Sequence, residues 1–244
     1  MRRLPGYLLA IIIILMTWSL AAFLVNSPVL PTPWVSIAML VKHFDALIPD
    51  FLVSLYRVLA AMFAGTLLAM PLGLVIGRSR KLDAICGPLL YLLYPIPKIV
   101  FLPVLLVLFG LGNTPKIALI AITIFFQVLV TVRDAAKMVP EAAIISIRSL
   151  GANRLDIFWH VVLPASLPEL FTALRISSGT AVAILFFAEA IAGSTGLGYY
   201  IVHSWALINY PAMFAGIISM AFLGVVLYEC FDLLEHSVSR HSRN

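Results

Sequence analysis

The sequence predicts an all-α integral membrane protein, a six-transmembrane-helix bundle with both termini in the cytoplasm. The first observation is composition: 62% of the 244 residues are hydrophobic and 11% are charged, whereas soluble domains carry about 25% charged residues. The second is that apolar residues form long continuous runs, which favours helices that satisfy their own backbone hydrogen bonds in lipid. The third is the distribution of cations between the runs, which sets the orientation.

Six apolar runs are long enough to cross a hydrocarbon core, which needs about 20 helical residues. They cover residues 7–25, 51–77, 85–109, 116–132, 169–191 and 212–233, and we expect them to form one domain over residues 1–244. The first run could instead be a signal peptide cleaved near Ser19-Leu20-Ala21. We favour a span, because the run exceeds the ~7–15 residues of a signal core.

Residues 26–50 are expected to form a loop between the first two runs, because Pro28, Pro31 and Pro33 punctuate it. Residues 34–47 within it are apolar enough to lie along the membrane interface.

Cations gather on one side of this layout. The predicted cytoplasmic side carries Arg2, Arg3, Arg78, Arg80, Lys81, Arg133, Lys137, Arg148, Arg154, Arg240 and Arg243. Lys42 and Lys116 lie on the opposite side. Because Lys and Arg are enriched in cytoplasmic loops, this bias places both termini and the segment 133–168 in the cytoplasm.

The third run contains Pro88, Pro95, Pro97 and Pro103, too many for one regular helix, because proline lacks the backbone N–H and clashes with the preceding turn. The run should therefore be broken. Irregular backbone at membrane depth is tolerated where it is packed in protein or lines a wet cavity. Pro95, Pro97 and Lys98 are thus candidates for a translocation pathway; the alternative is a kinked helix that only packs.

Four charged residues fall inside the predicted spans, where charges are costly and often functional. Arg57 lies near the outer end of its span and can extend to the headgroups, whereas Lys98 lies deeper and could meet an anion in transit. Arg175 and Glu189 share the fifth span, nearly four turns apart, and should point into the bundle. Each could line the pathway or pair with a neighbouring helix and fix packing only.

The segment Ser149–Pro168 is a polar interruption with its own pattern. Gly151 can adopt the left-handed backbone of a tight corner. Beyond it Leu155, Phe158, Trp159 and Val162 form one apolar stripe of a short helix, which Pro164 should end. Such a helix could lie on the membrane surface or dock on a partner.

The order of Gly151, Val161, Leu163 and Pro164 resembles the cytoplasmic loop of bacterial ABC importer permeases, which carries the coupling helix that sits in a cleft of the ATPase subunit. Family members usually have Glu-Ala-Ala where this chain has Ile145, Ser146 and Ile147; Glu141-Ala142-Ala143 occurs one helical turn earlier. The resemblance implies an ATPase-coupling set of Glu141, Ile145, Ser146, Ile147, Gly151, Leu155, Phe158, Trp159, Val161, Leu163 and Pro164.

Further matches resemble permeases of the nitrate, sulfonate and taurine importer group. They are LPTP at 30–33, SLYRV at 54–58, PLGLVIGRSRKLD at 71–83, FGLGNTPKIAL at 109–119 and the GSTGLG that follows Glu189. The resemblance implies a bacterial inner-membrane chain that works with two ATPase subunits, a second permease copy and a periplasmic or lipid-anchored binding protein. The expected cargo is an oxyanion such as sulfonate, taurine or nitrate, or alternatively a thiamine-precursor pyrimidine.

Several other functions are not indicated. The sequence has no G-x-x-x-x-G-K-[ST] loop, so ATP and Mg belong on the partner ATPase and this chain should hold no cofactor. It has neither a His-Glu-x-x-His motif nor a nucleophile with a plausible base, which argues against an enzyme or a metal site. Cys86 and Cys230 read as small buried hydrophobes, and the cations lie in loops rather than in a nucleic-acid-binding patch. A secondary transporter or a scaffold membrane protein remain the rivals; the first should show internal repeats and more intramembrane carboxylates.

Overall fold

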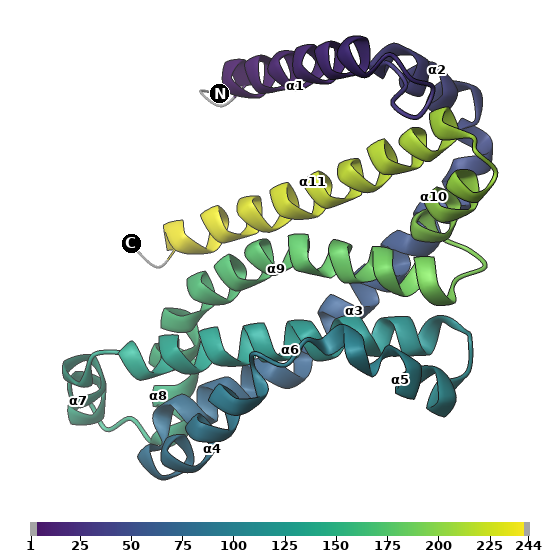
Figure 1. Cartoon of the computed structure of the whole chain (residues 1–244). Helices are drawn as coiled ribbons and strands as arrows, with labels where there is room; N and C mark the ends of the chain where they lie inside the picture. The colour runs from purple at the N-terminus through teal and green to yellow at the C-terminus, as the bar shows by residue number, and fades with distance from the viewer. Residues whose placement is uncertain (1–3, 242–244) are drawn as a thin grey trace. The chain divides into compact units, whose positions relative to one another are not determined.

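The computed structural model describes residues 4–241. Throughout this range the regular elements are helices and there is no strand, which confirms the all-α prediction (Figure 1). They are α1 (Leu4–Val25), α2 (Pro33–Lys42), α3 (Phe44–Arg78), α4 (Arg80–Leu93), η1 (Lys98–Phe101), α5 (Leu102–Phe109), α6 (Asn113–Met138), α7 (Glu141–Ser149), α8 (Arg154–Ile157), η2 (Phe158–Val162), α9 (Leu163–Ala192), α10 (Leu197–Ala206) and α11 (Tyr210–His241). Arg2, Arg3 and Arg243, which the cation count uses, lie outside the described residues, as does the side chain of Arg240.

Five helices in the described part are long and apolar enough to cross a membrane, and a sixth span results if α4, η1 and α5 are taken together. The helix Arg80–Leu93 and the helical segment Lys98–Phe109 meet at an angle of 82° across the break. The third run is therefore broken, as its prolines predict. Proline at this density prevents continuous i to i−4 hydrogen bonding, and the break falls at Pro95 and Pro97.

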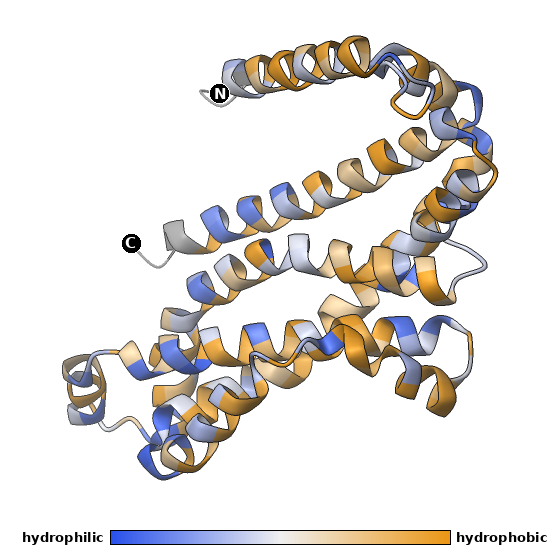
Figure 2. Cartoon of the chain, in the orientation of Figure 1, coloured by the Kyte–Doolittle hydropathy of each residue, from blue (hydrophilic) through white to orange (hydrophobic). Residues whose placement is uncertain are grey.

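The chain folds as two compact units. The first comprises residues 1–54 and 189–222, and the second comprises residues 55–188 and 223–244. Three long helices, α3, α9 and α11, contribute residues to both units. In the second unit, hydrophilic residues concentrate at the start of α4, the end of α6 and around α8, whereas α5 is hydrophobic (Figure 2).

Two sequence expectations about element boundaries were wrong. Residues 26–50 are not one loop, because α2 occupies Pro33–Lys42 and α3 already begins at Phe44. Pro33 lies in the first turn of α2, where the missing N–H has no intrahelical partner to lose. A proline at this position therefore starts a helix rather than interrupting one.

Pro164 does not end the helix that follows the Gly151 corner. The chain is helical from Arg154 to Ala192, and Phe158–Val162 forms a π-helical turn directly before the proline. Hydrogen bonding to the fifth residue back widens this turn, which accommodates the proline ring and its missing donor. Where the sequence predicted the end of a helix, the helix continues through a π turn.

The cysteine prediction was also wrong, since Cys86 is half-buried and Cys230 is exposed in the chain. A lipid-facing or partner-facing surface is solvent-exposed in an isolated chain, so apolar sequence surroundings do not imply burial here.

Glycines bring α3 and α6 into close contact within the second unit. A Cβ on Gly65 would lie 2.7 Å from the Ala121 carbonyl oxygen, and one on Gly77 would collide with the Arg133 carbonyl oxygen. Gly73 and Gly77 are four residues apart, the small-residue spacing that lets membrane helices approach closely. Only the absence of a side chain permits this backbone contact.

Substituting Gly77→Ala should force α3 and α6 apart and lower the free energy of unfolding by about 1–3 kcal/mol. Gly179→Ala is the matched control, because Gly179 is also within a helix but nothing lies within 4 Å of its added Cβ. That variant should be neutral or more stable by up to about 1 kcal/mol. Thermal unfolding in detergent measures both, and equal midpoints for the two variants would contradict the close contact.

Candidate functional site

The loop after α6 contains two short helices joined at a glycine. Gly151 has φ +87°, the left-handed backbone expected from the sequence. Its amide donates to the Arg148 carbonyl oxygen at 3.0 Å and closes the end of α7. Because a residue with a Cβ is strained at this φ, the glycine sets the direction in which the chain leaves α7.

A capping box begins the next helix. The Asn153 Oδ1 accepts hydrogen bonds from the amides of Leu155 at 2.8 Å and Asp156 at 3.0 Å, and the Asp156 carboxylate accepts from the Asn153 amide at 2.9 Å. These bonds fix the start of α8 three residues after the corner. This motif was not predicted, although Asn-x-x-Asp before a helix indicates a capping box.

The predicted apolar stripe is divided between two environments. Val162 is buried and Phe158 is half-buried, whereas Leu155 and Trp159 are exposed. Leu155 and Trp159 are four residues apart, as are Phe158 and Val162, so each pair lies on one side of the helix. Leu155 and Trp159 therefore remain available for an interaction.

The remaining predicted coupling residues are also mostly accessible. Exposed residues are Glu141, Ile145, Ser146, Gly151 and Pro164, and half-buried ones are Ile147, Val161 and Leu163. Leu150, at the end of α7, is 85% exposed. Exposed apolar side chains gathered on one loop indicate an interaction surface, and we use "coupling loop" for residues 139–164.

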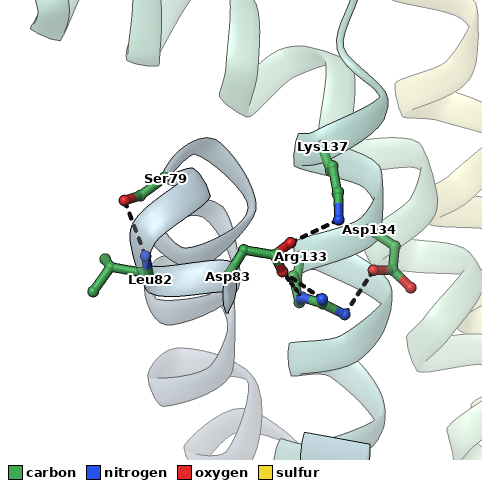
Figure 3. A network of polar contacts seen from close by, with 6 residues as sticks. All are labelled: Ser79, Leu82, Asp83, Arg133, Asp134 and Lys137. Carbon is green, nitrogen blue, oxygen red and sulfur yellow. Dashed lines mark hydrogen bonds and ion pairs between the residues drawn. The ribbon is translucent and has the colours of Figure 1, made fainter. Parts of the chain in front are cut away.

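A polar network fixes α4 to the end of α6, next to the coupling loop (Figure 3). The Asp83 carboxylate accepts from Arg133 Nε at 2.6 Å and from Lys137 Nζ at 2.6 Å, and Arg133 Nη2 also contacts it. The Arg133 side chain is 7% exposed and therefore depends on this carboxylate for compensation. Asp83 lies just outside a predicted span and was not among the predicted site residues; its position next to Arg80 and Lys81 was the available signal in the sequence.

Replacing Asp83 by Asn should leave the Arg133 guanidinium without its buried counter-ion and destabilise the chain by about 1.5–3 kcal/mol. Asp134→Asn is the control, because Asp134 contacts the same arginine at 3.1 Å but is 54% exposed; we expect a change within about 0.5 kcal/mol. Thermal unfolding midpoints in detergent provide the comparison. Equal losses in the two variants would show that burial of the network is unimportant.

Lys98 stabilises the break in the third span. Its ammonium donates to the carbonyl oxygens of Leu93 and Tyr94, both at 2.7 Å, at the end of α4, where helix carbonyls lack intrahelical donors. The Leu93 oxygen also accepts from the Ile96 amide at 3.3 Å. The side chain lies 4.7 Å from the centroid of the Phe126 ring. Lys98 and Pro97 line a pocket of about 330 Å³, whereas Pro95 lies in the adjoining turn and does not line it.

The pocket has polar groups on two further helices. Gln127 of α6 and Thr180 of α9 line it, with Gln127 Nε2 3.4 Å from Thr180 Oγ1. Sequence reasoning weighed only charges inside spans and therefore missed Gln127, an amide within a long apolar run. All of these residues belong to the second unit.

Two intramembrane arginines have partners within the second unit. Arg57 is buried rather than extended to the headgroups, and its Nε donates to Asn113 Oδ1 at 2.9 Å. Burial with a hydrogen-bond partner replaces the expected solvation by headgroups. Arg175 of α9 donates to Asp232 of α11 at 2.7 Å and lies 3.3 Å from Glu235. Its contacts favour the packing alternative.

Glu189 lies within the first unit and is fully buried. Its carboxylate accepts from Ser54 Oγ at 2.9 Å and from the Gly198 amide at 2.8 Å, while Ser54 Oγ accepts from the Leu197 amide at 2.8 Å. These amides are unpaired donors at the start of α10, where a negative charge is favourable. The carboxylate thereby holds the turn between α9 and α10 against α3.

Glu189→Gln should remove the negative charge that faces the first amides of α10 and weaken the hydrogen bond from the Gly198 amide, at a cost of about 1–2 kcal/mol. We expect faster hydrogen exchange at the Gly198 and Leu197 amides in an otherwise folded chain. The control is Glu169→Gln on the same helix, where the glutamate is exposed. Unchanged exchange at the start of α10 would contradict the assignment.

A helical bundle with a broken span, a largely apolar pocket with a few polar groups beside the break and an exposed loop of short helices is typical of a membrane transport subunit. Residues 65–240 match the family described as "Binding-protein-dependent transport system inner membrane component". The chain therefore belongs to this family of transport permeases, as the resemblance predicted.

Proteins of similar sequence are also named as transport permeases. The chain is 36% identical over 174 residues to the taurine transport system permease protein of Escherichia coli, a match that covers 71% of this chain and 63% of that protein. It is 34% identical to a putative ABC transporter permease protein of Methanocaldococcus jannaschii, over 86% of this chain and 82% of that protein. A putative aliphatic sulfonates transport permease protein of Bacillus subtilis is 30% identical, over 96% and 86% of the two chains. These relatives are transport permeases and not enzymes.

Solved structures show the same fold. A chain of the MetNI methionine ABC transporter in an inward-facing conformation aligns with a TM-score of 0.66 and 21% identity, over 81% of this chain and 98% of that chain.

Proposed function

We propose that this chain is the permease subunit of an ATP-binding cassette importer in a bacterial inner membrane. It pairs with a second permease copy and works with two ATPase subunits, which carry ATP and Mg, and with a periplasmic or lipid-anchored binding protein. The single observation that carries this proposal is the exposed apolar coupling loop on a chain of the permease family. Both termini and this loop face the cytoplasm, in accordance with the cation bias.

The coupling loop transmits motion because it is short and fixed at both ends. Gly151 and the Asn153 capping box set the direction of α7 relative to α8, and the Asp83 network fixes the end of α6 from which the loop begins. When the ATPase subunits close, Ile145, Leu155 and Trp159 follow the surface on which they dock. The loop thus biases the bundle between its two access states.

Cargo passes the break in the third span, where Pro95, Pro97 and Lys98 lie. A cation there favours a small oxyanion, and the named relatives for taurine and aliphatic sulfonates support this class. A formylaminopyrimidine transport permease of Halalkalibacterium halodurans, 25% identical over 92% of this chain, keeps a heterocycle as the second candidate. The ion pairs of Arg175 and the hydrogen bonds of Glu189 support roles in positioning helices, each within its own unit.

Gly151→Val should strain the corner by about 1–2 kcal/mol and lower ATP hydrolysis coupled to transport without preventing membrane insertion. The measurement uses vesicles that contain the permease, its ATPase and the binding protein. Gly151→Asn is the matched control, because asparagine tolerates left-handed backbone, and it should couple nearly as the wild type does.

The same vesicles test the proposal as a whole. Uptake should require ATP and the ATPase subunits. Uptake by the permease alone along an ion gradient would identify a secondary transporter instead, and full coupling in the Gly151→Val variant would rule out the corner as a transmitting element.

A further inference from the structure

Two polar groups in the Lys98 pocket have unused hydrogen-bonding capacity. The Lys98 ammonium has three donors, of which two bind the Leu93 and Tyr94 carbonyl oxygens. The Gln127 Oε1 is buried and has no hydrogen-bond partner. A buried acceptor without a partner costs free energy, which a ligand that carries a donor would recover.

The charge of Lys98 is compensated only in part. The carbonyls at the end of α4 carry about half a negative charge, and no carboxylate forms an ion pair with Lys98 within residues 4–241. The lysine is 8% exposed, so water screens it weakly. The pocket therefore attracts an anion.

The walls limit the size and shape of such an anion. Tyr94, Phe126 and Phe187 supply aromatic surface around the polar groups. The volume of about 330 Å³ is at the lower end of the ~300–1,000 Å³ of small-molecule sites. A small organic acid fits this description.

On the basis of the proposed permease function, we propose that this pocket is a passage site for a small organic oxyanion that also carries an N–H donor, such as an aminoalkyl sulfonate. The oxyanion binds the remaining Lys98 donor, and the N–H group donates to Gln127 Oε1. Thr180 orients the Gln127 amide through its 3.4 Å contact. Gln127 thereby gives the permease a selectivity of its own, distinct from that of the binding protein.

The test measures equilibrium binding to the permease–ATPase complex in phosphatidylcholine nanodiscs, without the binding protein. The probes are taurine and 1-propanesulfonate, which has a methyl group in place of the ammonium. We expect taurine to bind roughly tenfold more tightly, the value of one good hydrogen bond. Gln127→Leu should abolish this preference and leave propanesulfonate binding unchanged, and Lys98→Met should weaken both ligands.

Two controls separate this effect from misfolding. Gln127→Leu removes a buried unpaired oxygen, so the thermal midpoint should stay the same or rise. Thr180→Val, of the same shape, should reduce the preference through loss of amide orientation. Thr131→Val should not, because the Thr131 hydroxyl donates to the Gln127 backbone carbonyl oxygen and does not line the pocket.

Three results would overturn the proposal: no saturable binding of either probe, an unchanged preference in Gln127→Leu, or a Gln127-dependent loss of taurine binding when phosphatidylethanolamine is added. That lipid headgroup also combines an oxyanion, here a phosphodiester, with an N–H donor, so the last result would make the lipid the occupant. None of these results affects ATP-driven uptake with the binding protein, which tests the permease function separately.

Discussion

The binding of the Lys98 ammonium to the carbonyls at the end of α4 is the interaction on which the functional region depends. Backbone carbonyls inside a bilayer need partners, because no bulk water is available to them. The ammonium provides one for Leu93 and another for Tyr94, and the chain can therefore turn by 82° between α4 and α5. Without Lys98, the Leu93 carbonyl oxygen would keep only the Ile96 amide at 3.3 Å, and the Tyr94 carbonyl oxygen would lose its hydrogen bond to the ammonium. The pocket beside Lys98 lies at this turn, and residues of the break line it.

Two contacts between helices hold the elements around this irregular region in place within the second unit. The α3–α6 contact at Gly73 and Gly77 fixes two long helices backbone to backbone, and Asp83 joins the start of α4 to the end of α6. The broken span thus has one end tied to the helix from which the coupling loop emerges. In the proposed function, a displacement of that loop would reach a fixed point on α4 rather than a flexible connection.

Sequence reasoning predicted those features that follow from a single strong local rule. The break at Pro95 and Pro97, the left-handed Gly151 and the number of apolar runs are of this kind. It failed where two local effects compete, as at Pro164, where a π turn accommodates the ring. It also missed residues whose importance comes only from contact across helices. Gln127 is an uncharged amide within a long apolar run, and Asp83 lies outside a span. The sequence around each residue does not indicate which side chains of other helices it will contact.

The π turn at Phe158–Val162 has an evolutionary consequence. A π turn is equivalent to one residue inserted into an α-helix, so deletion of one residue there would restore regular winding. Such a deletion would rotate α8 by about 100° about the axis of α9 and shift it by about 1.5 Å. Trp159 and Leu155 would then point in a new direction while every residue of the transmembrane part stayed in place. Loss or gain of one residue at this turn therefore changes the direction of the exposed α8 side chains without any change in the sequence of the spans.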